Sequence, residues 1–455
     1  MLLIFSHTVS KRLQYICSFI FKELMGIDFK ITIDSEKFKT HTGPKINYSD
    51  TKIAADEFYI QNQPLLFEQH IKAKPIDCFT VNNNKAFFKT KNSDFPFDIF
   101  AASFYLLSRY EEYLPHEKDV YGRYAYENSL ANREGFLNLP LINIWVKNFA
   151  EKLKEKYSRP TGASGRAILN FQFSIFNFEP TYDIDIAYSY KHKGLWRNIG
   201  GFFKSPSIQR IKVLTGGEKD PFDCYNWLHH LHQQYNLKPI YFFLVAEANG
   251  PYDKNILPHK DAMWRLVKQH AERYAVGLHP SWQSGDNRSL LKKEKERLAT
   301  MVQDAGSVPA GAKHSMVQAA VSIPTLSRQH YIRFNLPEGY QRLITAGITD
   351  DYSMGYGSIN GFRASVASPF FWYDLEKEEQ TSLRIHPFCF MDANAFYEQR
   401  QNPEQTREEL THYLSVCKAV NGTMISIWHN NFLGASKDFE GWKEIYEQFI
   451  VQVQQ

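Results

Sequence analysis

Two aspartates, Asp183 and Asp185, stand one residue apart in the sequence TYDID. In extended backbone, residues two positions apart point to the same face, so both carboxylates would lie side by side. Two anions that close repel each other, and a bound cation or a shared proton relieves the repulsion. A hard divalent ion suits carboxylate ligands, and zinc accepts them when imidazole is also present. A pair of turn or helix-capping aspartates is the structural alternative.

Two histidines each follow a short apolar run directly. His279 comes after AVGL and before a proline, and His429 comes after ISIW. A neutral imidazole at the end of a strand can bind a metal, although a single such histidine can equally form a structural hydrogen bond. A third group, Ser327-Arg328-Gln329-His330-Tyr331, collects polar side chains in a loop after another apolar segment. Several strands that all end in Asp, His or Arg together predict one site.

The elements that would position these residues alternate between short apolar runs and helical patterns. We predict strands at residues 167–173, 239–245, 275–278, 319–323 and 424–428, and helices at residues 222–235, 261–274 and 292–303. Such alternation favours a largely parallel sheet or barrel with helices outside. In barrels of this kind the chemistry gathers at the carboxyl ends of the strands.

The first third of the chain has a different pattern. Residues 27–33 and 59–67 read as strands, residues 98–113 as a helix capped by Asp98, and residues 139–157 as an amphipathic helix. The run SRPTGASG that follows, residues 158–165, has the composition of a linker. The sequence thus predicts an N-terminal α+β domain of unknown role at residues 1–160 and a second domain at residues 166–455.

The composition narrows the class of protein. The 455 residues are 43% hydrophobic and 22% charged, as in soluble globular proteins, and the length suggests more than one domain. The net charge is +4 and no basic, aromatic-interleaved stripe occurs, so we expect no nucleic-acid partner. No apolar run reaches the roughly 18 residues of a membrane span. Five scattered cysteines without a CxxC pair fit a reducing compartment, and we expect a cytoplasmic protein.

A small basic cluster follows the aspartate pair. It consists of Lys191, Lys193 and Arg197 in the sequence KHKGLWRN. The cluster could bind an anionic glycan or a carrier phosphate, or it could belong to a solvated loop without a ligand.

The motifs resemble those of a known family. From about residue 167 to its end, the chain resembles the NodB-homology polysaccharide deacetylases, the fourth carbohydrate esterase family. The whole chain is similar to polysaccharide deacetylase family proteins of Bacteroidetes-type bacteria, which carry an extra N-terminal domain. The passages FYLLSRYEEYLP, SRQHYIRF, DDYSMGYGSINGFRA and WHN carry this resemblance. It implies a deformed (β/α) barrel of the polysaccharide deacetylase type, preceded by the smaller α+β domain.

The resemblance also implies a divalent metal, zinc, and its ligands. TYDID matches a spaced form of the family's first motif, which makes Asp183 the general base and Asp185 a metal ligand. His279 matches the first histidine of the second motif, His-Ser-x-x-His. Gln283 stands where the second histidine is expected. The third ligand would then be His330, the amide oxygen of Gln283, or a water.

The remaining motifs imply the catalytic groups. Arg328 would orient the base, and the backbone N–H of Tyr331 would help bind the oxyanion. An aspartate of the fourth region, Asp350 or Asp351, and His429 as general acid would complete the set.

The implied function is metal-dependent hydrolysis of an acetyl group from an N- or O-acetylated saccharide or envelope glycan precursor. The missing second histidine supports an alternative, a catalytically degenerate barrel that binds a glycan or a protein partner.

Overall fold

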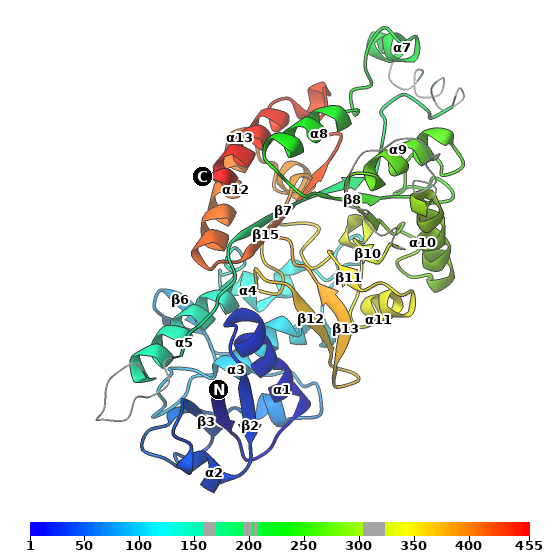
Figure 1. Ribbon diagram of the computed structural model, residues 1–455. Helices are drawn as coiled ribbons and strands as arrows, with labels where there is room; N and C mark the ends of the chain where they lie inside the picture. Colours follow the sequence, from blue (N-terminus) through cyan, green and yellow to red (C-terminus); the bar gives the residue numbers. More distant parts are fainter. Residues whose placement is uncertain (158–168, 195–197, 199–202, 204–206, 304–323) are drawn as a thin grey trace, which may run out of the picture. The chain divides into compact units, whose positions relative to one another are not determined.

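The structure is a computed structural model that describes residues 1–157, 169–194, 198, 203, 207–303 and 324–455 (Figure 1). The chain forms two compact units. The first unit comprises Met1–Asn177, Gly361–Pro387 and Ser415–Thr423, and the second comprises Phe178–Asn360, Phe388–Leu414 and Met424–Gln455. The predicted linker at residues 158–165 lies outside the described residues, so the boundary placed there stays a prediction. The first unit also takes in two later segments that a contiguous N-terminal domain would not contain.

The first unit contains a four-stranded sheet in the order β2-β1-β3-β4. Its strands are β1 (Leu2–Phe5), β2 (Phe29–Thr32), β3 (Lys45–Ser49) and β4 (Phe58–Gln61). Every neighbouring pair is parallel, which differs from the α+β arrangement predicted for this part of the chain. The difference arises because helices α1 and α2 carry the chain back between strands, and such crossovers produce parallel neighbours.

Besides one π-helix and short 3-10 helices, the described residues of the first unit form five α-helices and two hairpins. They are α1 (Lys11–Cys17), α2 (Ser35–Thr40), α3 (Ile99–Leu107), α4 (Leu130–Arg133), α5 (Leu141–Tyr157), β5 (Phe79–Val81) with β6 (Asn84–Ala86), and β12 (Phe370–Asp374) with β13 (Glu379–Ile385). Asp98 caps α3 as predicted, because its carboxylate accepts the backbone N–H of Ala101. The helix stops before the predicted residue 113, because Arg109 adopts a left-handed conformation with φ 55°.

A buried ion network explains the turn at Arg109. Arg109 Nε donates to Glu112 Oε1 over 2.7 Å, and Arg363 donates to both oxygens of the same carboxylate, over 2.8 and 2.6 Å. All three side chains are at most 2% exposed. Burial on its own would raise the pKa of Glu112, but Arg363 and Arg109 outweigh it and hold the pKa at about 2. The motif SRYEEY is therefore structural in this unit.

The second unit is mixed α/β and contains a large, mainly parallel sheet. Its strands follow the order β11-β10-β9-β8-β7-β15-β14, and the pairs β10–β11, β9–β10, β8–β9, β7–β8 and β14–β15 are parallel. The strands are β7 (Asn177–Ile184), β8 (Ile240–Phe243), β9 (Ala275–Leu278), β10 (Leu326–Ser327), β11 (Asp350–Asp351), β14 (Phe390–Met391) and β15 (Thr423–His429). The carboxyl ends of parallel strands meet at one edge of a sheet, where we expect the site.

Helices follow most of these strands. They are α7 (Ile208–Leu214), α8 (Tyr225–Gln234), α9 (Asp261–Ala271), α10 (Arg288–Gln303), α11 (Glu338–Thr345), α12 (Pro403–Ala419), which passes from the second unit into the first, and α13 (Trp442–Gln454). The predicted strand at residues 167–173 is wrong where it can be followed, since residues 169–173 form no strand and β7 begins at Asn177. The strand predicted at residues 319–323 lies outside the described residues. Among the helices described, none is long and apolar enough to cross a membrane.

Candidate metal centre

The two aspartates of TYDID lie at the carboxyl end of β7. Asp183 belongs to the strand itself, and Asp185 follows the last strand residue directly. Both side chains approach the same imidazole, since His279 Nε2 lies 3.0 Å from Asp185 Oδ1 and 3.9 Å from Asp183 Oδ2. The period-two arrangement expected from the sequence therefore brings both carboxylates to one place.

His279 stands directly after β9 and is 1% exposed. Its Nδ1 lies 2.6 Å from the backbone carbonyl oxygen of Arg328. A carbonyl oxygen only accepts hydrogen bonds, so Nδ1 carries the proton, and in the neutral ring Nε2 keeps its lone pair. That lone pair faces Asp185 Oδ1, so two electron-pair donors point at each other.

His330 approaches the same carboxylate from the loop after β10. Its Nε2 lies 3.2 Å from Asp185 Oδ2, and its Nδ1 lies 2.8 Å from Asp253 Oδ1. Burial on its own would lower the pKa of His330, but Asp185 and Asp253 outweigh burial and raise it to about 9. A histidine that is a metal ligand commonly donates its other ring N–H to a carboxylate in this way.

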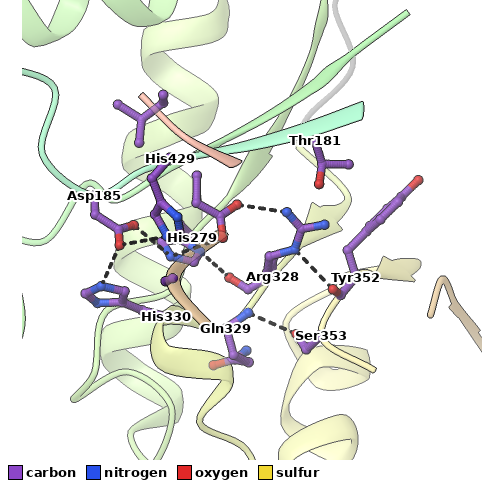
Figure 2. Close-up of polar contacts among 12 residues, drawn as sticks. Thr181, Asp185, His279, Arg328, Gln329, His330, Tyr352, Ser353 and His429 are labelled. Atoms are coloured by element: carbon purple, nitrogen blue, oxygen red, sulfur yellow. Dashed lines mark hydrogen bonds and ion pairs between the residues drawn. The ribbon is translucent and has the colours of Figure 1, made fainter. Parts of the chain in front are cut away.

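Asp185, His279 and His330 form a group suited to a metal ion. Each offers one ligand atom, and these atoms all lie within 4.8 Å of one another. Figure 2 shows the three side chains pointing toward one another. Asp185 Oδ1 is buried and has no hydrogen-bond partner among the described residues. An orphaned carboxylate oxygen facing imidazole nitrogens fits a divalent cation, and one carboxylate with two imidazoles is a common zinc donor set.

His429 is the last residue of β15 and approaches Asp185 from another side, with Nε2 3.4 Å from Oδ2. It is not one of the three residues whose ligand atoms lie within 4.8 Å of one another, and Asp392 contacts its other nitrogen. Asp392 accepts hydrogen bonds from Nδ1 and from the backbone N–H of His429, both over 2.6 Å. Burial would lower the pKa of His429, but Asp392 and Asp185 raise it well above its ordinary value.

Arg328 is fully buried and holds Asp183. Its Nη1 donates to Asp183 Oδ1 over 2.9 Å, and its Nε donates to the carbonyl oxygen of Tyr352 over 3.1 Å (Figure 2). The guanidinium also lies 4.4 Å from the ring centre of Phe242. These contacts fix the position of Asp183 and leave Oδ2 facing His279.

Other residues named from the sequence lie elsewhere or have other partners. Gln283 is exposed, whereas Asp185, His279 and His330 are half-buried or buried. Asp351 bonds Ser327 and Ser353 over 2.7 and 2.9 Å, and Asp350 accepts from its neighbour Thr349. That one of these aspartates serves the site stays a prediction; the carboxylate that contacts His429 is that of Asp392.

Tyr331 adjoins His330 and has a left-handed backbone, with φ 59°. Its ring packs edge-on against Trp282, with 5.5 Å between ring centres, and Trp282 stacks on Tyr252 over 3.9 Å. Sequence reasoning missed Asp253, which lies in a loop, and Asp392, which directly follows β14 at the start of a short helical segment. The only signal for Asp392 was its position after the short apolar run FCFM.

The chain is similar to known proteins in its first third by sequence and over more of its length by structure. Residues 2–158 match the model of a family of unknown function, DUF7033. No curated protein matches the sequence. Among solved structures, the chain is similar to one assigned as a polysaccharide deacetylase from Mycobacterium smegmatis, with 12% identity and a TM-score of 0.39. That similarity covers 62% of this chain and 84% of the other. Evidence for an activity comes instead from the side chains around Asp185.

Proposed function

We propose that this protein is a metal-dependent hydrolase that removes an acetyl group from an N- or O-acetylated saccharide or envelope glycan precursor. The second unit would be the deformed (β/α) barrel of the polysaccharide deacetylase type that the motifs resemble. The observation that carries the proposal is the arrangement around Asp185, where three imidazole Nε2 atoms lie within 3.4 Å of one carboxylate. The ion pair between Asp183 and Arg328 lies beside this arrangement, with Asp183 Oδ2 3.9 Å from His279 Nε2.

Asp185, His279 and His330 would hold the ion, which we propose to be zinc. A bound divalent ion supplies Lewis-acid polarisation of an acyl carbonyl and lowers the pKa of water. The protein's own contribution is orientation. The carbonyl of Arg328 and the carboxylate of Asp253 fix the rings of His279 and His330 through Nδ1, so that each Nε2 faces Asp185.

Asp183 would act as the general base. Arg328 occupies Oδ1 and leaves Oδ2 directed toward the group of ligands. A carboxylate held on one side and open on the other can accept a proton from water bound beside it. Burial of both partners, at 2% exposure or less, keeps this geometry fixed.

His429 would act as the general acid that protonates the departing amine or hydroxyl of the sugar. Its Nδ1 contacts Asp392. This contact turns Nε2 toward Asp185 of the ligand group. The backbone N–H of Tyr331 would help bind the oxyanion, as the third motif implies. The scattered cysteines, with no CxxC pair in the sequence, support the further expectation of a reducing, cytoplasmic location.

The test combines metal analysis with an assay of acetate release. The purified full chain is analysed for bound metal and incubated with N-acetylglucosamine oligomers and O-acetylated xylo-oligosaccharides. We expect about one zinc per chain and acetate release that Asp183→Asn abolishes while metal remains bound. His230→Ala, an exposed histidine of α8, is the matched control and keeps both metal and activity.

Two outcomes would overturn the proposal. A chain that binds no divalent metal lacks the proposed centre. A chain that binds metal and glycan but releases no acetate from any acetylated saccharide would instead be the catalytically degenerate binding protein.

A further inference from the structure

The loop that follows Asp185 leads to a cluster of exposed apolar side chains. Ile208, Ile211 and Leu214 of α7 are 74%, 49% and 46% exposed, and Phe203 just before them is 81% exposed. Single exposed apolar residues are ordinary on a protein surface, but several within one short segment indicate an interaction site.

Three apolar residues of α7 lie on one face of the helix and form a stripe. Ile208, Ile211 and Leu214 recur every third residue, so at about 100° per residue they span roughly one third of the helix circumference. Val213, which points to the other side, is buried. Arg210 and Lys212 fall just beyond the two edges of the stripe in the same projection. We call Ile208, Arg210, Ile211, Lys212 and Leu214 together the α7 surface.

The surrounding segment is strongly basic. Residues 188–219 contain seven Lys or Arg and one Glu, a net charge of +6, whereas the whole chain has a net charge of +4. Lys212 pairs with Glu218 over 2.8 Å, but both side chains are well exposed, and such pairs are weak and exchange readily. The α7 surface therefore combines an apolar stripe with a positive field.

The segment begins a few residues after Asp185, and a contact with Asp220 closes its base. Asp220 accepts the backbone N–H groups of Ser189, Tyr190 and Lys191, over 2.8, 2.8 and 2.9 Å. These three hydrogen bonds hold the two ends of the segment together, a few residues after Asp185 at the carboxyl end of β7.

We propose that the α7 surface binds the interface of an anionic phospholipid bilayer. An apolar stripe flanked on both sides by cations matches the boundary between acyl chains and phosphate headgroups. A second copy of the chain fits less well, because it would place two segments of the same positive charge against each other. The inference does not depend on the proposed hydrolase activity.

Vesicle co-sedimentation of the full chain tests the proposal. The vesicles are phosphatidylcholine alone, or phosphatidylcholine mixed with phosphatidylglycerol. We expect binding to the anionic vesicles that weakens as NaCl is added, and weak binding to the neutral vesicles. The triple variant Ile208→Ser, Ile211→Ser, Leu214→Ser should bind anionic vesicles at least about tenfold more weakly.

A second variant and a control separate the contributions. Arg210→Gln with Lys212→Gln should lose part of the preference for anionic vesicles. Val120→Ser with Ile175→Ser removes exposed apolar residues elsewhere, at 90% and 88% exposure, and should bind as the unchanged protein does. Absence of vesicle binding, equal binding to both vesicle types, or an unchanged triple variant would overturn the proposal. So would a dimer in light scattering that the triple variant abolishes, since the occupant would then be a second copy.

Discussion

His330 Nδ1 and Asp253 Oδ1 lie 2.8 Å apart and join two loops of the second unit, the loops after β10 and β8. The same oxygen of Asp253 accepts the backbone N–H of Trp282 over 3.0 Å, in the loop after β9. One buried carboxylate therefore ties three successive strand-end loops together and sets the direction of the His330 ring.

Replacing Asp253 should weaken metal binding without removing a ligand. In Asp253→Ala, His330 loses the acceptor for Nδ1–H and is free to rotate or change tautomer. We expect metal affinity to fall about 10- to 100-fold, with a smaller loss in Asp253→Asn, whose amide oxygen still accepts a hydrogen bond. Competition with a chromogenic chelator measures the affinity. Asp261→Ala, an exposed carboxylate at the start of α9, is the control. Equal affinity in Asp253→Ala and the control would show that Asp253 has no part in the centre.

The third ligand can be identified with a pair of variants. His330→Ala removes an imidazole that faces Asp185, whereas Gln283→Ala removes an exposed amide. We expect His330→Ala to lose bound metal during dialysis, because firm zinc sites in proteins have at least three protein ligands. Gln283→Ala should keep the metal content of the unchanged protein. Metal analysis after dialysis gives the answer, and retention by His330→Ala with loss by Gln283→Ala would reverse the assignment.

Changing His429 should separate metal binding from turnover. Its Nδ1 is bound to Asp392, and the three atoms that could hold a metal belong to other residues. We expect His429→Ala to cut acetate release by a factor of about 10² or more, with bound metal unchanged. Steady-state assays and metal analysis on the same preparation provide both values. Loss of metal together with activity would make His429 a ligand, and full activity would exclude it as the general acid.

Local patterns predicted the strand-end residues well. His279 and His429 stand where apolar runs end, and such runs form strands in both cases. The strand predicted at residues 167–173 was misplaced for two reasons. Apolar and polar residues alternate there as they do in a strand, and β7 itself contains Pro180, a residue that argues against a strand.

Long-range pairings could not be read from the sequence. The sequence favours His330 as the third ligand but leaves Gln283 and a water open, because spacing along the chain does not show which side chain turns inward. The partners Asp253 and Asp392 lie 77 and 37 residues from their histidines, a separation over which local periodicity carries no information. Arg109 likewise ends α3 through a contact with Arg363, 254 residues away.

The ion network of the first unit makes a testable prediction about stability and pH. Glu112 bonds both Arg109 and Arg363 while buried, so Glu112→Gln removes this counter-charge from Arg363 and leaves Arg109 paired with Glu111 alone. We expect the variant to lose about 3 to 5 kcal/mol of the free energy of unfolding of the first unit at neutral pH. The urea dependence of amide hydrogen exchange in α3 measures this loss.

The pH dependence has a definite sign. The pKa of Glu112 is lowered from 4.5 to about 2, so its contribution is fully present above pH 4.5 and is lost as the pH falls toward 2. The difference in stability between the unchanged protein and Glu112→Gln should therefore shrink when the measurement is repeated near pH 3. Glu111→Gln is the matched comparison, because burial raises the pKa of Glu111 and a neutral amide should cost less there. A difference for Glu112→Gln that stays constant between neutral pH and pH 3, or that is smaller than the one for Glu111→Gln, would show that the charge of Glu112 does not stabilise this unit.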